Sequence, residues 1–362
     1  ALPAASPVVE VTGAGVSNQI VAFFSNTTAV VDTASVNDGT DQITVTNANN
    51  AHLNQDLTFS IGMGGDQVTL NGEIEVTGTV NINSVDAAVT NNNVTVDITA
   101  ATLNVTAASF GAAAPVAHID TAVASLSVNT SGSNGNQFIS EADGITALNV
   151  NAGAGNVTIV AGGAITDADA DVDVTATALA ATATAVGATG PLVGTAVASL
   201  TLNTSVANGN QRIREVDDLT AFNVNAGAGD VTIIAGGAIN DGDGVLDVTA
   251  TAFIATATNV GAAGPLIGTS VASLVLNTSG ANGSQFIRET DDLTALNLNA
   301  GTGNVTIVAG GSLTDGDGVV DVTANSLTVA ATAVGSTGPL IGTSVASLLL
   351  NTSGANGDQR IR

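Results

Sequence analysis

The sequence contains no cysteine, tryptophan or tyrosine, and aromatic residues make up only 2% of its 362 residues. The fold therefore cannot depend on disulfide bonds, and a secreted chain of this length needs none if its core is continuous. A compact globular core normally uses large aromatic side chains. A narrow interior that is filled layer by layer with Ala, Val, Leu and Ile does not need them, and apolar residues still reach 44%.

Basic residues are also scarce, because lysine is absent and five arginines face 31 aspartates and glutamates. The net charge of −26 argues against nucleic-acid binding, which needs a basic surface, and against docking on anionic lipid. It permits cation binding. No apolar run reaches the roughly 18 residues of a membrane helix, so the sequence predicts no membrane span.

A repeat of fixed length dominates what is present. The tripeptide Ala-Ser-Leu begins at Ala124, Ala198, Ala272 and Ala346, so each step is 74 residues, with no insertion or deletion between copies. A fixed period of this kind is typical of stacked, quasi-one-dimensional architectures. Such a chain suits a spacer, fibre or adhesive surface better than a single catalytic pocket.

Apolar and polar residues alternate with a period of two in the reference repeat, residues 197–270, which predicts half-buried strands. Gly-rich corners separate these strands, and no helical period is sustained. The repeat divides into three lines of sequence, residues 197–218, 219–244 and 245–270. We interpret each line as one coil of a parallel β-solenoid. A string of separate β-sandwich domains is the second interpretation.

The three lines align without gaps, and this alignment predicts which residues stack. The expected internal ladder is Leu200, Phe222 and Val248. The expected polar ladder, near a corner, is Asn203, Asn225 and Thr251. Upstream, we expect two strands around a solenoid corner at Asn71-Gly72 rather than a hairpin.

The rest of the chain is assigned by its likeness to this repeat. We expect a cap in residues 1–50, degenerate coils in 51–122, repeats in 123–196, 197–270 and 271–344, and a truncated repeat in 345–362. Val96–Thr99 echoes Val172–Thr175, and Phe23, Phe24 and Phe59 lie where a cap needs bulk. Because the sequence stops inside the last repeat, we expect a longer natural chain or a neighbouring subunit that covers this end.

Two segments suggest a family. Gly229–Gly242 (GDVTIIAGGAINDG) and Val260–Ser279 resemble consecutive lines of filamentous-haemagglutinin-like bacterial exoproteins, and the likeness covers about residues 72–362. The resemblance implies a secreted or surface-anchored right-handed β-helix that acts in adhesion, aggregation or matrix formation. The Asn-Pro-Asn motif of the family's secretion domain is absent, so the resemblance does not extend to an export route.

Acidic residues recur at the corners of every repeat. The corners are Glu141/Asp143, Asp167/Asp169/Asp171/Asp173, Glu215/Asp217/Asp218, Asp241/Asp243/Asp247, Glu289/Asp291/Asp292 and Asp315/Asp317/Asp321. Carboxylates stacked about 4.8 Å apart repel unless a cation or protons intervene, and aspartates on Gly-rich turns suit Ca²⁺. The expected metal ligands are Asp167, Asp169, Asp171, Glu215, Asp217, Asp241, Asp243, Glu289, Asp291, Asp315 and Asp317.

The line alignment also places Glu215 over Asp241 and Asp217 over Asp243. The alternative is that these corners are solvated and that Asp-Gly serves only as turn chemistry.

Three functions are compatible with these patterns. The first is a non-enzymatic extracellular protein that forms a fibre, sheath or surface filament by self-association. The second is an adhesin stalk that presents a site for cells or glycans. The third is a carbohydrate-active enzyme with an acidic pair as acid and base. We expect no enzyme, because the carboxylates recur in every repeat whereas an active site is normally singular.

Overall fold

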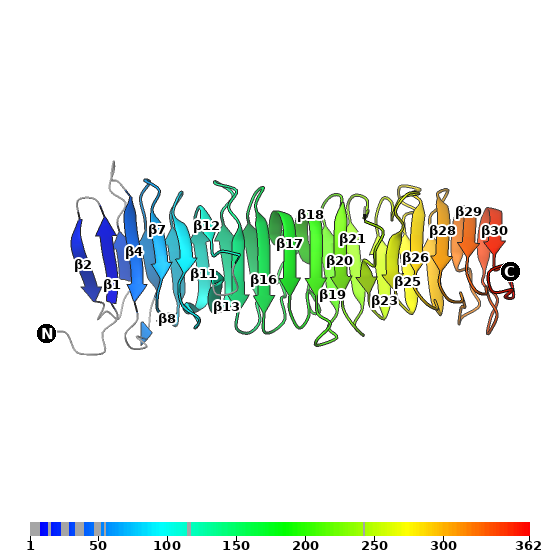
Figure 1. Cartoon of the computed structure of the whole chain (residues 1–362), viewed down its shortest axis with the longest axis horizontal. Helices are drawn as coiled ribbons and strands as arrows, with labels where there is room; N and C mark the ends of the chain where they lie inside the picture. The colour runs from blue at the N-terminus through cyan, green and yellow to red at the C-terminus, as the bar shows by residue number, and fades with distance from the viewer. Residues whose placement is uncertain are drawn as a thin grey trace. The chain divides into compact units, whose positions relative to one another are not determined.

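The computed structural model describes residues 8–13, 16–22, 29–32, 40–46, 52–53, 56–113, 117–241 and 243–362. The chain divides into two compact units, Ala1–Ala183 and Thr184–Arg362. Every named element of the described residues is a β-strand, and the strands of each unit lie as successive rungs in Figure 1. Among the same residues, no helix has the length and apolarity that a membrane crossing requires.

The described residues of the first unit form seventeen strands. Their bounds are β1 Val8–Gly13, β2 Val16–Ala22, β3 Ala29–Asp32, β4 Asp41–Thr46, β5 His52–Leu53, β6 Leu57–Ser60, β7 Gln67–Leu70, β8 Ile74–Val76, β9 Thr79–Asn83, β10 Ala88–Asn91, β11 Ile98–Thr106, β12 Ser109–Phe110, β13 Ile119–Asn129, β14 Gln137–Glu141, β15 Ala147–Asn151, β16 Asn156–Ala161 and β17 Val174–Thr182.

Thirteen strands form from the described part of the second unit. Their bounds are β18 Val193–Asn203, β19 Gln211–Glu215, β20 Ala221–Asn225, β21 Val231–Ala235, β22 Val248–Thr249, β23 Ala252–Thr256, β24 Ile267–Ser270, β25 Ser273–Asn277, β26 Gln285–Glu289, β27 Ala295–Asn299, β28 Asn304–Ala309, β29 Val322–Ala330 and β30 Thr343–Asn351.

Parallel pairing defines the fold. In the first unit, β1 pairs antiparallel with β2 and with β4; the pairings after this point, such as β4 with β7 and β7 with β10, are parallel. In the second unit, neighbours such as β18 with β20 and β19 with β21 also pair in parallel. The predicted parallel β-solenoid is confirmed, and separate β-sandwiches, which are built from antiparallel sheets, are not what the strands form. The corner at Asn71-Gly72 is likewise confirmed, because β7 and β8 each pair in parallel with other coils.

Two ladders of parallel strands run through the second unit. The first ladder holds residues 199–203 of β18, then β20, β22, β24, β26, β28 and residues 326–330 of β29. The second ladder holds residues 193–195 of β18, then β19, β21, β23, β25, β27 and residues 322–323 of β29.

One sequence repeat does not span a whole number of coils, but exceeds one by half a coil. β20 and β27 are equivalent strands of successive repeats, 74 residues and seven strands apart, and they lie on the first and the second ladder respectively. Because seven is odd and each coil contributes one strand to each ladder, a repeat spans about three and a half coils. Equivalent sites of neighbouring repeats in this unit therefore fall on different ladders.

The predicted stacking is correct for one coil and wrong for the next. Leu200 pairs with Phe222, and Asn203 pairs with Asn225, as the line alignment predicts. Val248, however, pairs with Val224 rather than with Phe222. The register moves by two residues because the acidic corner between β21 and β22 takes up part of the line that the alignment assigned to strand.

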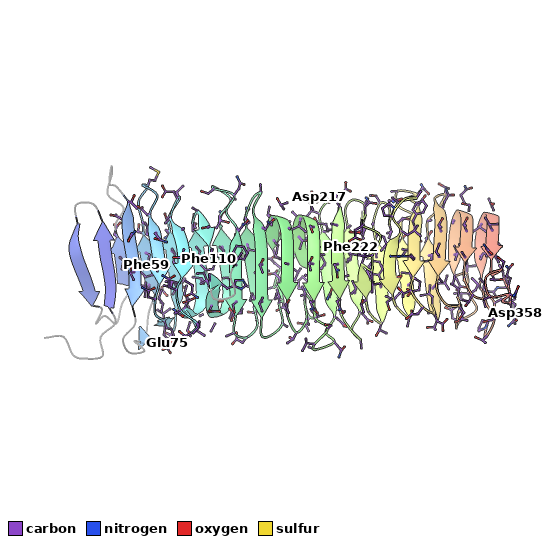
Figure 2. All side chains as sticks on the ribbon, in the orientation of Figure 1. Phe59, Glu75, Phe110, Asp217, Phe222 and Asp358 are labelled. Carbon is purple, nitrogen blue, oxygen red and sulfur yellow. The ribbon has the colours of Figure 1, made fainter. Side chains whose placement is uncertain are left out.

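Small aliphatic side chains fill the interior, with few aromatic ones among them. Phe59, Phe110 and Phe253 are fully buried. Figure 2 labels Phe59 and Phe110 on the rungs of the first unit and Asp217 at a corner of the second unit. Burial of one phenylalanine side chain is worth about 1.5–3 kcal/mol. Phe23 and Phe24 lie outside the described residues, and the predicted cap in residues 1–50 stays a prediction.

Candidate metal centres

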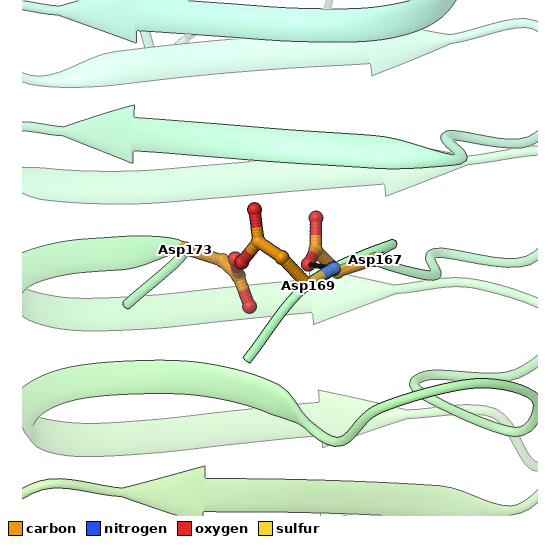
Figure 3. A group of neighbouring side chains, drawn as sticks. All are labelled: Asp167, Asp169 and Asp173. Atoms are coloured by element: carbon orange, nitrogen blue, oxygen red, sulfur yellow. Dashed lines mark hydrogen bonds between the residues drawn. The ribbon is translucent and has the colours of Figure 1, made fainter. Parts of the chain in front are cut away.

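Three loops each bring three aspartates together. The groups, called triads here, are Asp167/Asp169/Asp173, Asp241/Asp243/Asp247 and Asp315/Asp317/Asp321, and in each the carboxylate oxygens lie within 4.8 Å of one another. Figure 3 shows the first triad gathered on one loop. The first and third aspartates of each triad are buried and the second is exposed. Among the described residues, groups of three possible ligands occur at these loops alone.

The buried carboxylates of the second triad are anchored to neighbouring coils. Phe222 N–H in β20 donates to Asp241 Oδ1 at 3.3 Å, and Gly268 N–H in β24 donates to Asp247 Oδ2 at 2.7 Å. Asp243 N–H donates to the other oxygen of Asp241 at 3.0 Å. The triad therefore joins strands of the first ladder from the coil before it and from the coil after it.

The second triad concentrates negative charge where water is scarce. The exposed fractions of Asp241 and Asp247 are 6% and 2%. Burial, together with the charges of Asp241 and Asp243, raises the pKa of Asp247 to about 7 against the opposing effects of Gly268 N–H and Arg288. Two carboxylates 4.8 Å apart repel by about 3.5 kcal/mol at an effective dielectric constant of roughly 20. A bound cation would remove this penalty.

Arginine does not supply that cation in the second triad. The Arg288 guanidinium reaches its loop from β26, but its Nη2 donates to the carbonyl oxygens of Gly244 at 2.5 Å and Val245 at 2.8 Å. These hydrogen bonds of Arg288 fix the loop backbone, and they do not neutralise the carboxylates of the triad.

The third triad leaves a buried carboxylate oxygen without a donor. Asp321 Oδ2 accepts Gly342 N–H at 2.6 Å, whereas Asp321 Oδ1 is buried and has no hydrogen-bond partner. Burial raises the pKa of Asp321, and the charges of Asp315 and Asp317 raise it further. At Asp315, burial also opposes ionisation, but backbone N–H donors, among them Asp317 N–H, outweigh it and lower the pKa. An ionised carboxylate thus faces an unsatisfied one, which suits a hard cation.

The first triad opens onto a small cavity. The cavity has a volume of about 150 Å³ and is lined by the triad, by Asp171 and by outward-facing polar side chains that include Ser125, Ser127 and Asn149. An oxygen-coordinated cation usually takes six to eight ligands. Three carboxylates cannot fill such a shell, so the open side leaves room for water or ligand oxygens.

Six of the eleven expected ligands belong to triads. Asp171 lines the same cavity, and its N–H donates to Asp169 Oδ1 at 2.8 Å. The other four lie at two other corners, Glu215 with Asp217 and Glu289 with Asp291. There Glu215 and Glu289 are buried and accept the hydroxyls of Thr195 and Thr269, at 2.6 and 2.7 Å.

Both carboxylate oxygens of Glu215 and of Glu289 have hydrogen-bond donors, whereas Asp321 Oδ1 in the third triad has none. Burial raises the pKa values of Glu215 and Glu289 to about 7, against hydrogen bonds from threonine and from backbone N–H groups. Asp217 and Asp291 are exposed beside them, and no third ligand joins either pair among the described residues. We therefore leave these four residues out of the ligand set that we propose.

The expected stacking of Glu215 over Asp241 is wrong. Glu215 pairs with Ala235, and Asp241 instead accepts the N–H of Phe222. Alignment from the ends of the lines failed because the lines contain loops of different length.

The third member of each triad was absent from the expected ligands, although it was recognised as acidic. Asp173, Asp247 and Asp321 immediately precede a strand, where they read as strand-flanking residues. The usable signal was the spacing Asp-x-Asp-x-x-x-Asp, which recurs unchanged in all three repeats.

Comparison with known proteins gives no identity. No known protein family, curated protein or solved structure matches this chain. The resemblance to filamentous-haemagglutinin-like exoproteins therefore depends on the quoted residues alone, and the fold and the triads carry the functional argument.

Proposed function

We propose that this chain is a structural β-solenoid of the extracellular surface, in which Ca²⁺ bound at the Asp triads holds adjacent coils together. The observation that carries the proposal is the recurrence of one three-carboxylate arrangement, with the same spacing, in three successive repeats. A structural site is expected to recur with the coils that it supports, whereas a catalytic site is normally single.

The donor set favours Ca²⁺ over transition metals. Each triad offers only carboxylate oxygens, which are hard ligands, whereas Zn²⁺ and Cu²⁺ sites favour imidazole or thiolate. The triads use neither histidine nor cysteine. Ca²⁺ sites of extracellular modules have dissociation constants of about 10⁻⁴–10⁻³ M, which a shallow site with an exposed second carboxylate can provide.

The repeat architecture supports a scaffold role. A solenoid gains length by adding coils, each of which contacts only its neighbours. A filament that self-associates and an adhesin stalk that carries a ligand site elsewhere both use this property. Net charge of −26 opposes association of copies unless cations offset it, so Ca²⁺ dependence and filament formation are linked in this proposal.

Calorimetric titration of the chelator-treated chain with Ca²⁺ tests the metal proposal. We expect about three ions per chain, one for each triad, and weaker binding of Mg²⁺, which demands a tighter octahedral shell. The variant Asp217→Asn, altered at an exposed corner outside the triads, serves as the control and should keep all sites. Absence of saturable Ca²⁺ binding would refute the metal proposal.

Electron microscopy of the same samples, with Ca²⁺ and with chelator, tests the scaffold proposal. Uniform filaments that shorten or disperse in chelator support self-association. Single particles under both conditions contradict it and favour the adhesin stalk.

A further inference from the structure

A fourth corner with the triad spacing lies in the first unit, but asparagine replaces two of its aspartates. Asn91, Asn93 and Asp97 occupy the first, second and third positions of the Asp-x-Asp-x-x-x-Asp pattern. Val96–Thr99, which contains the third position, is the segment whose sequence echoes Val172–Thr175. The corner is therefore a natural counterpart of the triads with less negative charge.

The backbone turn is the same in both kinds of corner. Asn93 N–H donates to Asn91 Oδ1 at 2.7 Å, and Asp169 N–H donates to Asp167 Oδ2 at 2.7 Å. In both corners, the N–H two residues further on donates to Oδ1 of the second side chain at 2.8 Å.

The third side chain is also anchored alike, because its Oδ2 accepts a backbone N–H from the following coil. The distances are 2.8 Å for Asp97, 2.7 Å for Asp247 and 2.6 Å for Asp321.

The two kinds of corner differ at the remaining oxygen of the third side chain. In the asparagine corner, Asn93 Nδ2 donates to Asp97 Oδ1 at 2.8 Å. An aspartate at the second position has no N–H to donate. In the third triad the corresponding atom, Asp321 Oδ1, is buried and has no partner. An amide hydrogen thus satisfies in one corner the oxygen that lacks a donor in the other.

We infer that the residue at the second position decides whether a corner binds a cation. Aspartate at this position requires a cation, bound between the second and third side chains. Asparagine instead donates its own amide hydrogen to the third side chain, so that no cation is needed. The cation then lies where Asn93 Nδ2 lies in the asparagine corner. This inference builds on the proposed function, since it assigns the discriminating residue of the same sites.

The first test adds a site. Asn93→Asp removes the amide donor and creates a second carboxylate beside Asp97, so calorimetric titration should show about four Ca²⁺ ions per chain instead of three. Asn156→Asp, at an exposed position at the start of β16, adds the same charge outside the triads and their cavity and should leave the number at three.

The second test removes a site. Asp243→Asn gives the second triad an amide that can donate to Asp247, so the number of ions should fall from three to two. Because the amide removes a negative charge, the variant should also melt at a higher temperature than the wild type in chelator. A variant that merely damaged the loop would lower that temperature.

The outcomes separate the two proposals. No Ca²⁺ binding by the wild type overturns the proposed function. Three sites in the wild type together with three in Asn93→Asp, or with a lower melting temperature in chelator for Asp243→Asn, overturn the inference and leave the proposed function standing. If Asn93→Asp does not fold, the Asp243→Asn result decides.

Discussion

Acidification should act in opposite directions on the Ca²⁺-free and the Ca²⁺-bound protein, and Asp247 is the residue with which to show it. Burial and the neighbouring carboxylates raise its pKa from 3.8 to about 7 in the folded state. A group whose pKa is raised on folding stabilises the fold below its unfolded pKa, and this contribution is lost as the pH rises through the folded pKa. Without Ca²⁺, the second unit should therefore become more stable as the pH falls from 8 to 5.5.

The magnitude follows from the two pKa values. Protonation of a group with folded and unfolded pKa values of about 7 and 3.8 adds about 2 kcal/mol to the free energy of unfolding when the pH falls from 8 to 5.5. For a domain of this size, that corresponds to a rise in melting temperature of about 4–8 °C. Glu215 and Glu289 have raised pKa values as well and act in the same direction.

With saturating Ca²⁺, the sign reverses. Ligands must be deprotonated, so metal affinity falls as the pH falls. Ca²⁺ stabilises the folded state by about 2.7 kcal/mol per site at a hundred times its dissociation constant, and acidification removes this term. The difference in melting temperature between Ca²⁺ and chelator should therefore shrink from pH 8 to pH 5.5.

Melting curves of the wild type and Asp247→Asn, recorded in chelator at both pH values, isolate this residue. Asparagine keeps an oxygen for Gly268 N–H but cannot ionise. The variant should therefore lack about 2 kcal/mol of the pH response, and it should melt above the wild type at pH 8. An equal pH response in both proteins would refute the assignment of the effect to Asp247.

Two further predictions concern the scaffold. Phe253→Ala should destabilise the second unit by about 3–5 kcal/mol in denaturant titration, because the ring is fully buried between β21 and β25; a loss below 1 kcal/mol contradicts this packing. Gly283→Ala should lower the melting temperature markedly because a Cβ there lies 1.7 Å from the carbonyl oxygen of Thr258, whereas Gly280→Ala, with no atom within 4 Å of its Cβ, is the matched control. Similar melting of the two alanine variants would show that the coils are not packed this closely.

The sequence was sufficient for the class of fold because period-two alternation and an exact repeat are local signals. Leu200 and Phe222 could be paired from it, since the segment between them keeps one strand-and-corner pattern. The partner of Val248 could not be predicted, because the acidic corner before it adds residues to the line of sequence that do not belong to a strand. The number of residues in a loop is visible in the sequence, but how many of them leave the coil depends on hydrogen bonds such as that of Phe222 N–H to Asp241.

The candidate site was predictable in part for the same reason. Acidic residues two apart were recognised as ligands, and Asp241 and Asp243 do converge. Asp247 was missed because it lies six positions after Asp241 in the sequence. Only the path of the loop brings its carboxylate close to those of Asp241 and Asp243. Glu215 was included although its corner supplies Thr195 as a donor, and that donor lies a whole coil away in the sequence.

Because the repeat is offset by half a coil, successive triads contact different ladders. The second triad contacts β20 and β24, which belong to the first ladder. In the third triad, Asp321 receives the N–H of Gly342, which immediately precedes the part of β30 that pairs with Val322 of the second ladder. A repeat of a whole number of coils would place every triad on one ladder and leave the other without cations. Because the repeat contains an odd number of strands, cations bound at the triads would reinforce the two ladders in turn, and a chelator should then increase hydrogen exchange in both β24 and β30.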